Sequence, residues 1–250
     1  MERRWIFALI VLIAIVAASS ICYIYLLPEK PEKIEEIGGK YNVAIYYWKN
    51  NRTTIEYTDE TGKHSGLFLT TMRNALEWIK TNTPKDSVFL CWWDYGHMIK
   101  GYAERNVVIR NPSREILKSV TDPSKIKEFD PHERIVDVAT AFSTTDSNEA
   151  LRIMQKYGAS YIFITRMEFA KSYWMFYIAS LNTTEYTCKS KEECTYYSFF
   201  SKDWPLKDYS LFSDKAKETI IAQLLENREI THFTLIYSDK NVKIYRVSQF

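Results

Sequence analysis

The sequence predicts an α/β protein in which a single N-terminal transmembrane helix is followed by a mixed α/β domain with a C-terminal β-hairpin. Three observations predict this fold class. An uncharged run covers residues 5–27. Short apolar runs then alternate with stretches of helical spacing through the middle of the chain, which is the pattern of strands joined by helices. Near the C-terminus, two β-prone runs flank a polar turn at residues 238–241, as in a hairpin.

The uncharged run predicts a membrane anchor. A helix over residues 5–27 would be about 35 Å long, enough to cross a hydrocarbon core of roughly 30 Å. The alternative is a cleaved signal peptide with a small-residue site at 17–20. We favour the anchor because residues 21–27 stay apolar after that site. Arg3 and Arg4 precede the run, which indicates a single-pass protein with a cytoplasmic N-terminus and an extracytoplasmic domain.

The composition divides the chain into three parts and excludes some partners. We expect a transmembrane anchor at 1–28, a charged linker containing Pro and Gly at 29–40, and a globular core domain at 41–250. The formal net charge is +2 and no basic block stands out, so nucleic acid is not an expected partner. With 7 glycines in 250 residues, no Gly-rich phosphate loop is found.

The first half of the globular domain contains apolar runs bounded by turn residues, which predict strands. Leu69, Met72, Leu76 and Ile79 follow helical spacing before Pro84, so a helix is expected to end there. The expected strands are 42–48, 55–57, 87–90 and 106–109, a hairpin turn covers 59–62, and the expected helices are 67–80 and 112–120.

The second half shows the same alternation and ends in the hairpin. Asp146 or Ser147 is expected to cap a helix that Gly158 ends. The expected helices are 134–142, 147–157, 168–181 and 213–227, the expected strands are 160–165, 232–237 and 242–247, and the expected loops are 121–131 and 182–208.

The strand at 87–90 leads into an unusual group of side chains, Trp92, Trp93, Asp94 and Tyr95. Ligands commonly bind at the carboxyl ends of strands in α/β sheets. The indoles are able to wall a pocket in which Asp94 accepts a hydrogen bond from a hydroxyl group. Chemistry alone leaves an alternative open, in which the tryptophans belong to the core and Asp94 caps a helix that starts near Tyr95.

A second group follows the strand at 160–165. Glu168, Lys171 and Met175 are spaced i, i+3 and i+7, so they share one face of the predicted helix. A carboxylate, an ammonium and a thioether in one stripe would suit a pocket wall. The alternative is an ion pair above a core methionine.

Both groups resemble motifs of one enzyme family. Residues 92–96 are identical to the Trp-Trp-Asp-Tyr-Gly (WWDYG) signature of oligosaccharyltransferase catalytic subunits, glycosyltransferases that move a lipid-linked glycan onto Asn of Asn-x-Ser/Thr. In that family the Trp-Trp-Asp part holds the Ser/Thr. The archaeal and eukaryotic types carry a second motif, Asp-x-x-Lys-x-x-x-Met/Ile, and this chain has Glu168 where that motif has Asp. The resemblance implies a sequon-binding pocket formed by Trp92, Trp93, Asp94, Tyr95, Glu168, Lys171 and Met175.

The resemblance reaches the C-terminal soluble core domain and not the catalytic body. In the family, carboxylates of a multi-span membrane region bind Mn or Mg and activate the acceptor amide. The acidic cluster at 130–133 lacks metal-ligand spacing, so neither metal ligands nor catalytic residues are expected here. The chain is therefore interpreted as an acceptor-recognising protein in N-glycosylation, inactive alone, with acceptor polypeptides and a separate multi-span catalytic subunit as partners. The alternative is a membrane-anchored structural or interaction module that no longer binds sequons.

The cysteines are expected to play different parts. Cys188 and Cys194 lie in a polar loop and are candidates for a disulfide if the domain is extracytoplasmic. Cys91 ends a predicted strand and is expected to be a buried thiol.

Overall fold

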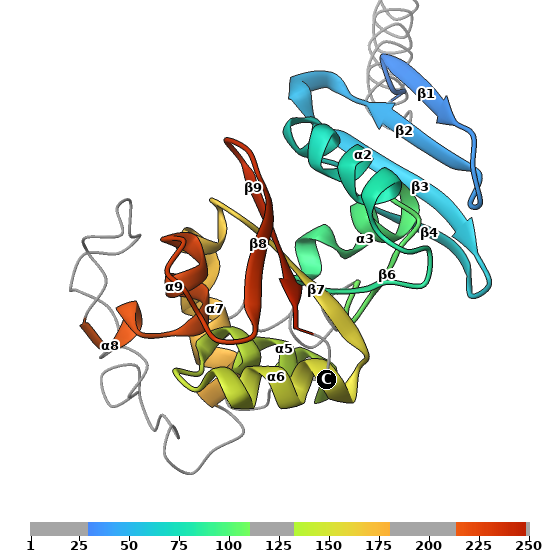
Figure 1. The fold of residues 1–250 in the computed structure, drawn as a ribbon. Helices are drawn as coiled ribbons and strands as arrows, with labels where there is room; N and C mark the ends of the chain where they lie inside the picture. The colour runs from blue at the N-terminus through green and yellow to red at the C-terminus, as the bar shows by residue number, and fades with distance from the viewer. Residues whose placement is uncertain (1–29, 111–132, 181–213, 249–250) are drawn as a thin grey trace, which may run out of the picture.

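The computed structural model describes residues 30–110, 133–180 and 214–248. Several predicted features lie outside these ranges: the anchor, the helix expected at 112–120, residues 130–132 of the acidic cluster, and the cysteines Cys188 and Cys194. Within them, none of the helices has both the length and the apolar character that crossing a bilayer requires. The described residues form two β-sheets with helices packed on them, shown in Figure 1.

The N-terminal sheet is antiparallel, with the strand order β1-β2-β3-β4. Its strands are β1 (Lys33–Ile37), β2 (Val43–Tyr47), β3 (Thr53–Asp59) and β4 (Gly62–Leu67). A linker was expected at 29–40, but residues 33–37 of that stretch form the strand β1. Its sequence is charged, and it is held by tertiary contacts: Arg73 donates two hydrogen bonds to Glu35, at 2.7 and 2.9 Å, and Tyr47 donates a third at 2.6 Å.

The inner face of this sheet packs on α3 (Trp93–Gly101). Side chains of β2 and β3 alternate, and Ile45, Ile55 and Tyr57 are buried on this face, as expected for a sheet with one face in the core. Close approach requires Gly101, because a Cβ added there would lie 2.6 Å from Cδ1 of Tyr57. The sheet and α3 are therefore joined by tight packing.

The second sheet is mixed and has the order β6-β5-β7-β9-β8. The parallel strands β5 (Val88–Leu90), β6 (Asn106–Val107) and β7 (Ala159–Thr165) are extended by the antiparallel hairpin of β8 (Phe233–Ser238) and β9 (Val242–Val247). The mixed α/β class and the C-terminal hairpin are thus confirmed. The strands that lead into the two motifs lie side by side, because β5 pairs with β7.

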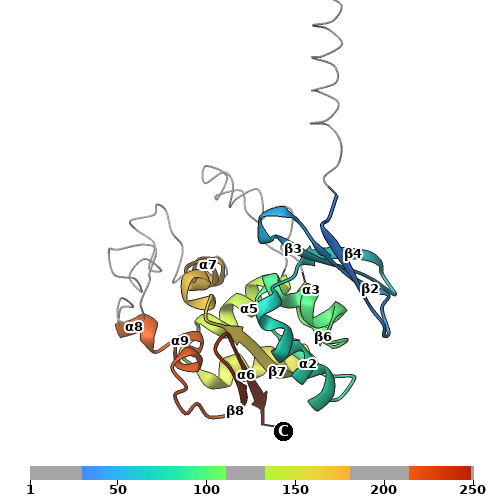
Figure 2. The same ribbon diagram turned by 90° about the horizontal axis from the view of Figure 1, so that it is seen from above.

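Figure 2 shows the helices that accompany the two sheets. They are α2 (Arg73–Asn82), α3, α5 (Glu133–Ser143), α6 (Ser147–Lys156), α7 (Glu168–Ser180), α8 (Asp214–Lys217) and α9 (Ile220–Leu225), with 3-10 turns at Lys49–Asn51 and Thr70–Met72. The helix α5 packs on α6 and α7. As predicted, Asp146 caps α6, accepting from the backbone N–H of Asn148 at 2.8 Å, and Gly158 follows the helix with φ of +62°.

The prediction of a single helix at 213–227 is wrong for the described residues 214–227, because α8 and α9 are separate helices. The break lies at Thr219, whose backbone is extended and whose buried hydroxyl donates to the carbonyl of Ala216 at 2.7 Å. The next amide, of Ile220, donates to the carbonyl of Thr144 at 2.9 Å. A hydroxyl residue that bonds the local backbone competes with helix continuation, and here tertiary contacts favour the break.

Candidate functional site

The first motif occupies the turn from β5 into α3. Trp92 has extended backbone angles and precedes the first helical residue, Trp93, without a side-chain cap hydrogen bond. Asp94 therefore does not cap the helix. It lies in the first turn of α3, where the helix dipole favours a negative charge. Trp92 is 1% exposed and stacks on Trp93, with ring centroids 4.1 Å apart, whereas Trp93 and Asp94 are only partly buried.

The second motif meets the first through an ion pair. Nζ of Lys171 lies 2.9 Å from Oδ2 of Asp94, and the two side chains are 20% and 29% exposed. The same ammonium donates to the hydroxyl of Tyr95 at 3.1 Å and lies 4.6 Å from the Tyr95 ring centroid. Two motifs that are far apart in the sequence therefore meet at Asp94 and Lys171.

Beneath the ion pair lies a buried polar chain that begins at Tyr95. The Tyr95 hydroxyl and Oγ1 of Thr165 are 2.8 Å apart. Burial raises the pKa of Tyr95 well above its ordinary value, so the phenol stays protonated. Because an ammonium can only donate, the Tyr95 oxygen accepts from Lys171, and either hydroxyl is able to donate in the bond between Tyr95 and Thr165.

Thr165 is the site residue that sequence reasoning missed. It ends β7, and its Oγ1 also accepts from the backbone N–H of Met167 at 3.0 Å. In return, the carboxylate of Glu168 accepts from the backbone N–H of Thr165. The spacing of Thr165 and Glu168 matches that of a capping box, Ser/Thr-x-x-Glu, but the threonine oxygen accepts from Met167 and not from Glu168. That spacing was readable in the sequence and would have linked Thr165 to Glu168.

Glu168 itself faces the interior. Its side chain has no exposure, and its Oε1 has no hydrogen-bond partner among the residues that the structure describes. Burial raises the pKa of this carboxyl, against the opposing effect of the nearby Lys171. Met175 is also fully buried. Of the residues that the resemblance assigns to the pocket, those that reach the surface are Trp93, Asp94 and Lys171.

Cys91 and His97 flank the first motif in the sequence. In the described ranges, no cluster of three or more His, Cys, Asp or Glu side chains is placed to hold a metal ion. Cys91 is a buried free thiol, as predicted, and burial raises its pKa. His97 is 6% exposed, and its Nδ1 lies 3.2 Å from the Tyr57 hydroxyl.

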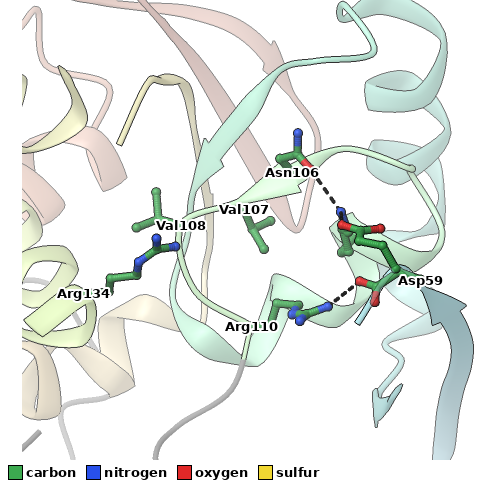
Figure 3. Close-up of a pocket in the computed structure, with 8 residues that line it drawn as sticks. Asp59, Asn106, Val107, Val108, Arg110 and Arg134 are labelled. Atoms are coloured by element: carbon green, nitrogen blue, oxygen red, sulfur yellow. Dashed lines mark hydrogen bonds and ion pairs between the residues drawn. The ribbon is translucent and has the colours of Figure 1, made fainter. Parts of the chain in front are cut away.

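A polar cavity of about 220 Å³ lies beside the edge strand β6 and the last turn of α3. Figure 3 shows Arg110 reaching Asp59 across it, at 2.6 Å between Nη1 and Oδ2. Lys100 is likewise engaged by Asn106 at 3.0 Å and by Glu60 at 3.4 Å. The cavity is lined by Asp59, Glu60, Lys100, Asn106, Val107, Val108, Arg110 and Arg134. Neither Asp94 nor Lys171 lines it, so it is distinct from the meeting point of the two motifs.

No family model matches the chain, but curated relatives share one activity in their names. The dolichyl-diphosphooligosaccharide–protein glycosyltransferase subunit STT3B of Oryza sativa subsp. japonica is 28% identical over 92 residues, 37% of this chain and 10% of that protein. The dolichyl-phosphooligosaccharide-protein glycotransferase of Methanocaldococcus jannaschii is 31% identical over 88 residues, 35% and 8% of the two chains. The subunit stt3 of Schizosaccharomyces pombe is 38% identical over 45 residues, 18% and 6%.

Solved structures of the same family resemble the chain as well. The C-terminal globular domain of an oligosaccharyltransferase from Archaeoglobus fulgidus has a TM-score of 0.48 and 22% identity, covering 72% of this chain and 99% of that domain. An A. fulgidus oligosaccharyltransferase tethered to an acceptor peptide with the NVT sequon has a TM-score of 0.43 and 15% identity, covering 69% of this chain and 24% of that protein. The relatives in sequence confirm the resemblance to oligosaccharyltransferases, and the matches span a tenth or less of the curated relatives cited above.

Proposed function

We propose that this chain recognises acceptor polypeptides containing Asn-x-Ser/Thr, at the surface formed by Trp93, Asp94 and Lys171. One observation carries the proposal. Two motifs distant in sequence are brought together in an ion pair with 2.9 Å between Nζ of Lys171 and Oδ2 of Asp94. The resemblance to oligosaccharyltransferases supplies the substrate class.

The chemistry of the surface suits a hydroxyl that carries a methyl group. An ionised carboxylate offers about four acceptor positions on its two oxygens. Lys171 contacts Oδ2 of Asp94, which leaves acceptor capacity on Oδ1 for the Ser or Thr hydroxyl. The Trp93 ring, backed by the buried Trp92 at 4.1 Å, offers an apolar face for the Thr methyl. A peptide without the hydroxyl would bury Asp94 without a partner, which is the basis of rejection.

The buried residues of the two motifs act as support in this proposal. The Tyr95 hydroxyl accepts a hydrogen bond from the Lys171 ammonium and forms a second hydrogen bond with the Thr165 hydroxyl, and these contacts hold Lys171 in position. Glu168 holds the start of α7 to the end of β7. The position of the ion pair is thus set by groups that the peptide does not touch.

In this proposal the chain acts as part of, or accessory to, a transferase whose multi-span catalytic region is a separate polypeptide. The predicted anchor at 5–27 would place the site at the extracytoplasmic membrane face. The alternative, a structural module that no longer binds sequons, is favoured by the burial of Glu168 and Met175, which leaves a shallow surface instead of a deep pocket.

A peptide titration of the full chain in lipid nanodiscs separates these two functions. Peptides with Asn-x-Thr and Asn-x-Ser are expected to bind more tightly than the matched Asn-x-Ala peptide. A Gln-x-Thr peptide is expected to bind about as well as Asn-x-Thr, because the described surface reads the hydroxyl and not the amide. Equal affinity for the Thr and Ala peptides, or no binding of either, would favour the structural module.

A further inference from the structure

The outer face of the N-terminal sheet carries an exposed row of side chains that crosses all four strands. The strand register aligns Ile34 of β1, Tyr46 of β2, Thr54 of β3 and Leu67 of β4. Ile34 and Leu67 are large apolar side chains that are 52% and 43% exposed. The described helix that packs on β3 and β4 is α3, and it covers the opposite face, which holds Ile55 and Tyr57. The row therefore faces away from the described core.

Aromatic and basic side chains extend this row at the end of the sheet where β1 begins. Trp48 stacks on Tyr46 with ring centroids 6.1 Å apart, and its Nε1 donates to Oγ1 of Thr54 at 2.9 Å. The Arg52 guanidinium lies 5.1 Å from the Trp48 ring centroid. Lys49, at the same end, is exposed. Amphipathic rings combined with basic groups are the residue types that gather at the water interface of a membrane.

The same face becomes polar toward its other end. The next cross-strand row contains Glu36, Glu56 and Ser65, with Glu56 paired to Lys63 at 2.9 Å. Thr58 then faces Lys63 across the strands. From Thr54 to Thr58 the strand advances by roughly 13 Å, and over this length the face changes from apolar and aromatic to charged.

The direction of this gradient matches the path of the chain. The uncharged run ends at Leu27 and β1 begins at Lys33, a separation that extended chain spans in at most about 20 Å. The apolar end of the outer face is therefore the end tied to the predicted anchor. The exposed positive charges of Lys49 and Arg52 lie at this end of the sheet, and negative lipid headgroups attract such charges.

We propose that the outer face of the N-terminal sheet rests on an anionic lipid surface. Ile34, Tyr46, Trp48 and Leu67 enter the headgroup region, and the end marked by Thr58 points into water. This contact fixes how the domain sits on the membrane and thus the height of the acceptor site. The inference goes beyond acceptor recognition and rests on the predicted anchor, not on the function of Asp94.

Spin labels on the full chain in vesicles of phosphatidylcholine and phosphatidylglycerol test the contact. One variant carries the label at Leu67→Cys, a second at Ile34→Cys, and the matched control at Thr58→Cys on the same face. The chain without an added cysteine gives the background. At positions 67 and 34, collision with oxygen is expected to exceed collision with a water-soluble nickel chelate several-fold, and at position 58 the ratio is expected to reverse.

Each other outcome overturns the proposal or one of its parts. Equal nickel accessibility at the three positions overturns the lipid contact. Dipolar broadening between labels at position 67 assigns the face to a second copy of the chain instead. The anionic preference predicts that the difference in oxygen-to-nickel collision ratio between position 67 and position 58 decreases in pure phosphatidylcholine and in a Lys49→Glu and Arg52→Glu double variant. An unchanged difference overturns this preference. Failure of the chain to float with vesicles removes the anchor and the contact together, while peptide discrimination measured in detergent still reports on Asp94 separately.

Discussion

Replacing Asp94 with Ala is expected to remove discrimination between Asn-x-Thr and Asn-x-Ala peptides while leaving the fold intact. The proposal gives Asp94 the acceptor role toward the substrate hydroxyl. The variant loses that acceptor but keeps the Trp93 face, so residual affinity for both peptides is expected to be equal. Asp94→Asn keeps an acceptor oxygen of similar reach without the charge, and it is expected to retain a reduced preference.

The magnitude follows from the surroundings of the carboxylate. A hydrogen bond to a charged group contributes about 1.5 to 3 kcal/mol, and 1.4 kcal/mol corresponds to about tenfold in affinity. The Asp94 side chain is 29% exposed and already paired with Lys171. Its hydrogen bond to the peptide hydroxyl is therefore expected to contribute about 1.5 kcal/mol, the lower limit of this range. The parent protein is therefore expected to bind the Asn-x-Thr peptide about tenfold more tightly than the Asn-x-Ala peptide. For Asp94→Ala the two affinities are expected to be nearly equal.

The assay is calorimetric titration with far-UV circular dichroism and urea unfolding as controls for folding. Loss of this partly exposed ion pair is expected to change the free energy of unfolding by about 1 kcal/mol. Glu149→Ala removes a partly exposed carboxylate from the first turn of α6 and is expected to leave the ratio of the affinities for the Thr and Ala peptides unchanged. A folded Asp94→Ala protein with the parent's ratio would refute the assigned role of the carboxylate.

Three further variants follow from the contacts. Lys171→Ala is expected to weaken peptide binding without erasing the Thr preference in the same titration, and loss of the preference would contradict its supporting role. Gly96→Ala places a Cβ 2.3 Å from the Ile109 carbonyl oxygen, so urea unfolding is expected to show a loss of about 1 to 3 kcal/mol, and a parent-like midpoint would contradict that close contact. The Arg73 guanidinium lowers the pKa of Glu35 from 4.5 to about 2, so this pair stabilises the fold above pH 4.5 and is lost as the pH falls toward 2. Glu35→Gln is expected to flatten that part of the stability profile, and parallel profiles for the two proteins would exclude the linkage.

The elements that the sequence predicted well are those whose signal is local. Runs such as 87–90 and 160–165 are apolar on both sides because each becomes a central strand between helices. Asp146 and Gly158 mark the limits of α6 by their own backbone chemistry. The two motifs came together as expected because parallel neighbouring strands present their carboxyl ends at one edge.

The elements that the sequence concealed depend on distant partners. Nothing in the charged stretch 33–37 shows that Arg73 will hold Glu35 and so fix an additional strand. Spacing placed Glu168, Lys171 and Met175 on one helix face, but α7 is apolar over most of its sequence. Its sequence therefore gave little indication of which part of that stripe would be buried. The structure buries Glu168 and Met175 and leaves Lys171 near the surface.

The geometry of the candidate site is set by the register of two strands and not by a loop. The last register pair of β5 and β7 is Leu90 with Ile162. Trp93 begins α3 three residues after Leu90, and Thr165 ends β7 three residues after Ile162, so Tyr95 and Thr165 are brought to the same level. A slip of one residue between β5 and β7 would shift one motif relative to the other by roughly 3.3 Å. A shift of that size would break the ion pair of Lys171 and Asp94, in which Nζ and Oδ2 are 2.9 Å apart. Because one slip would also exchange the side chains on the two faces of each strand, the packing of the core and the placement of the ion pair depend on the same register.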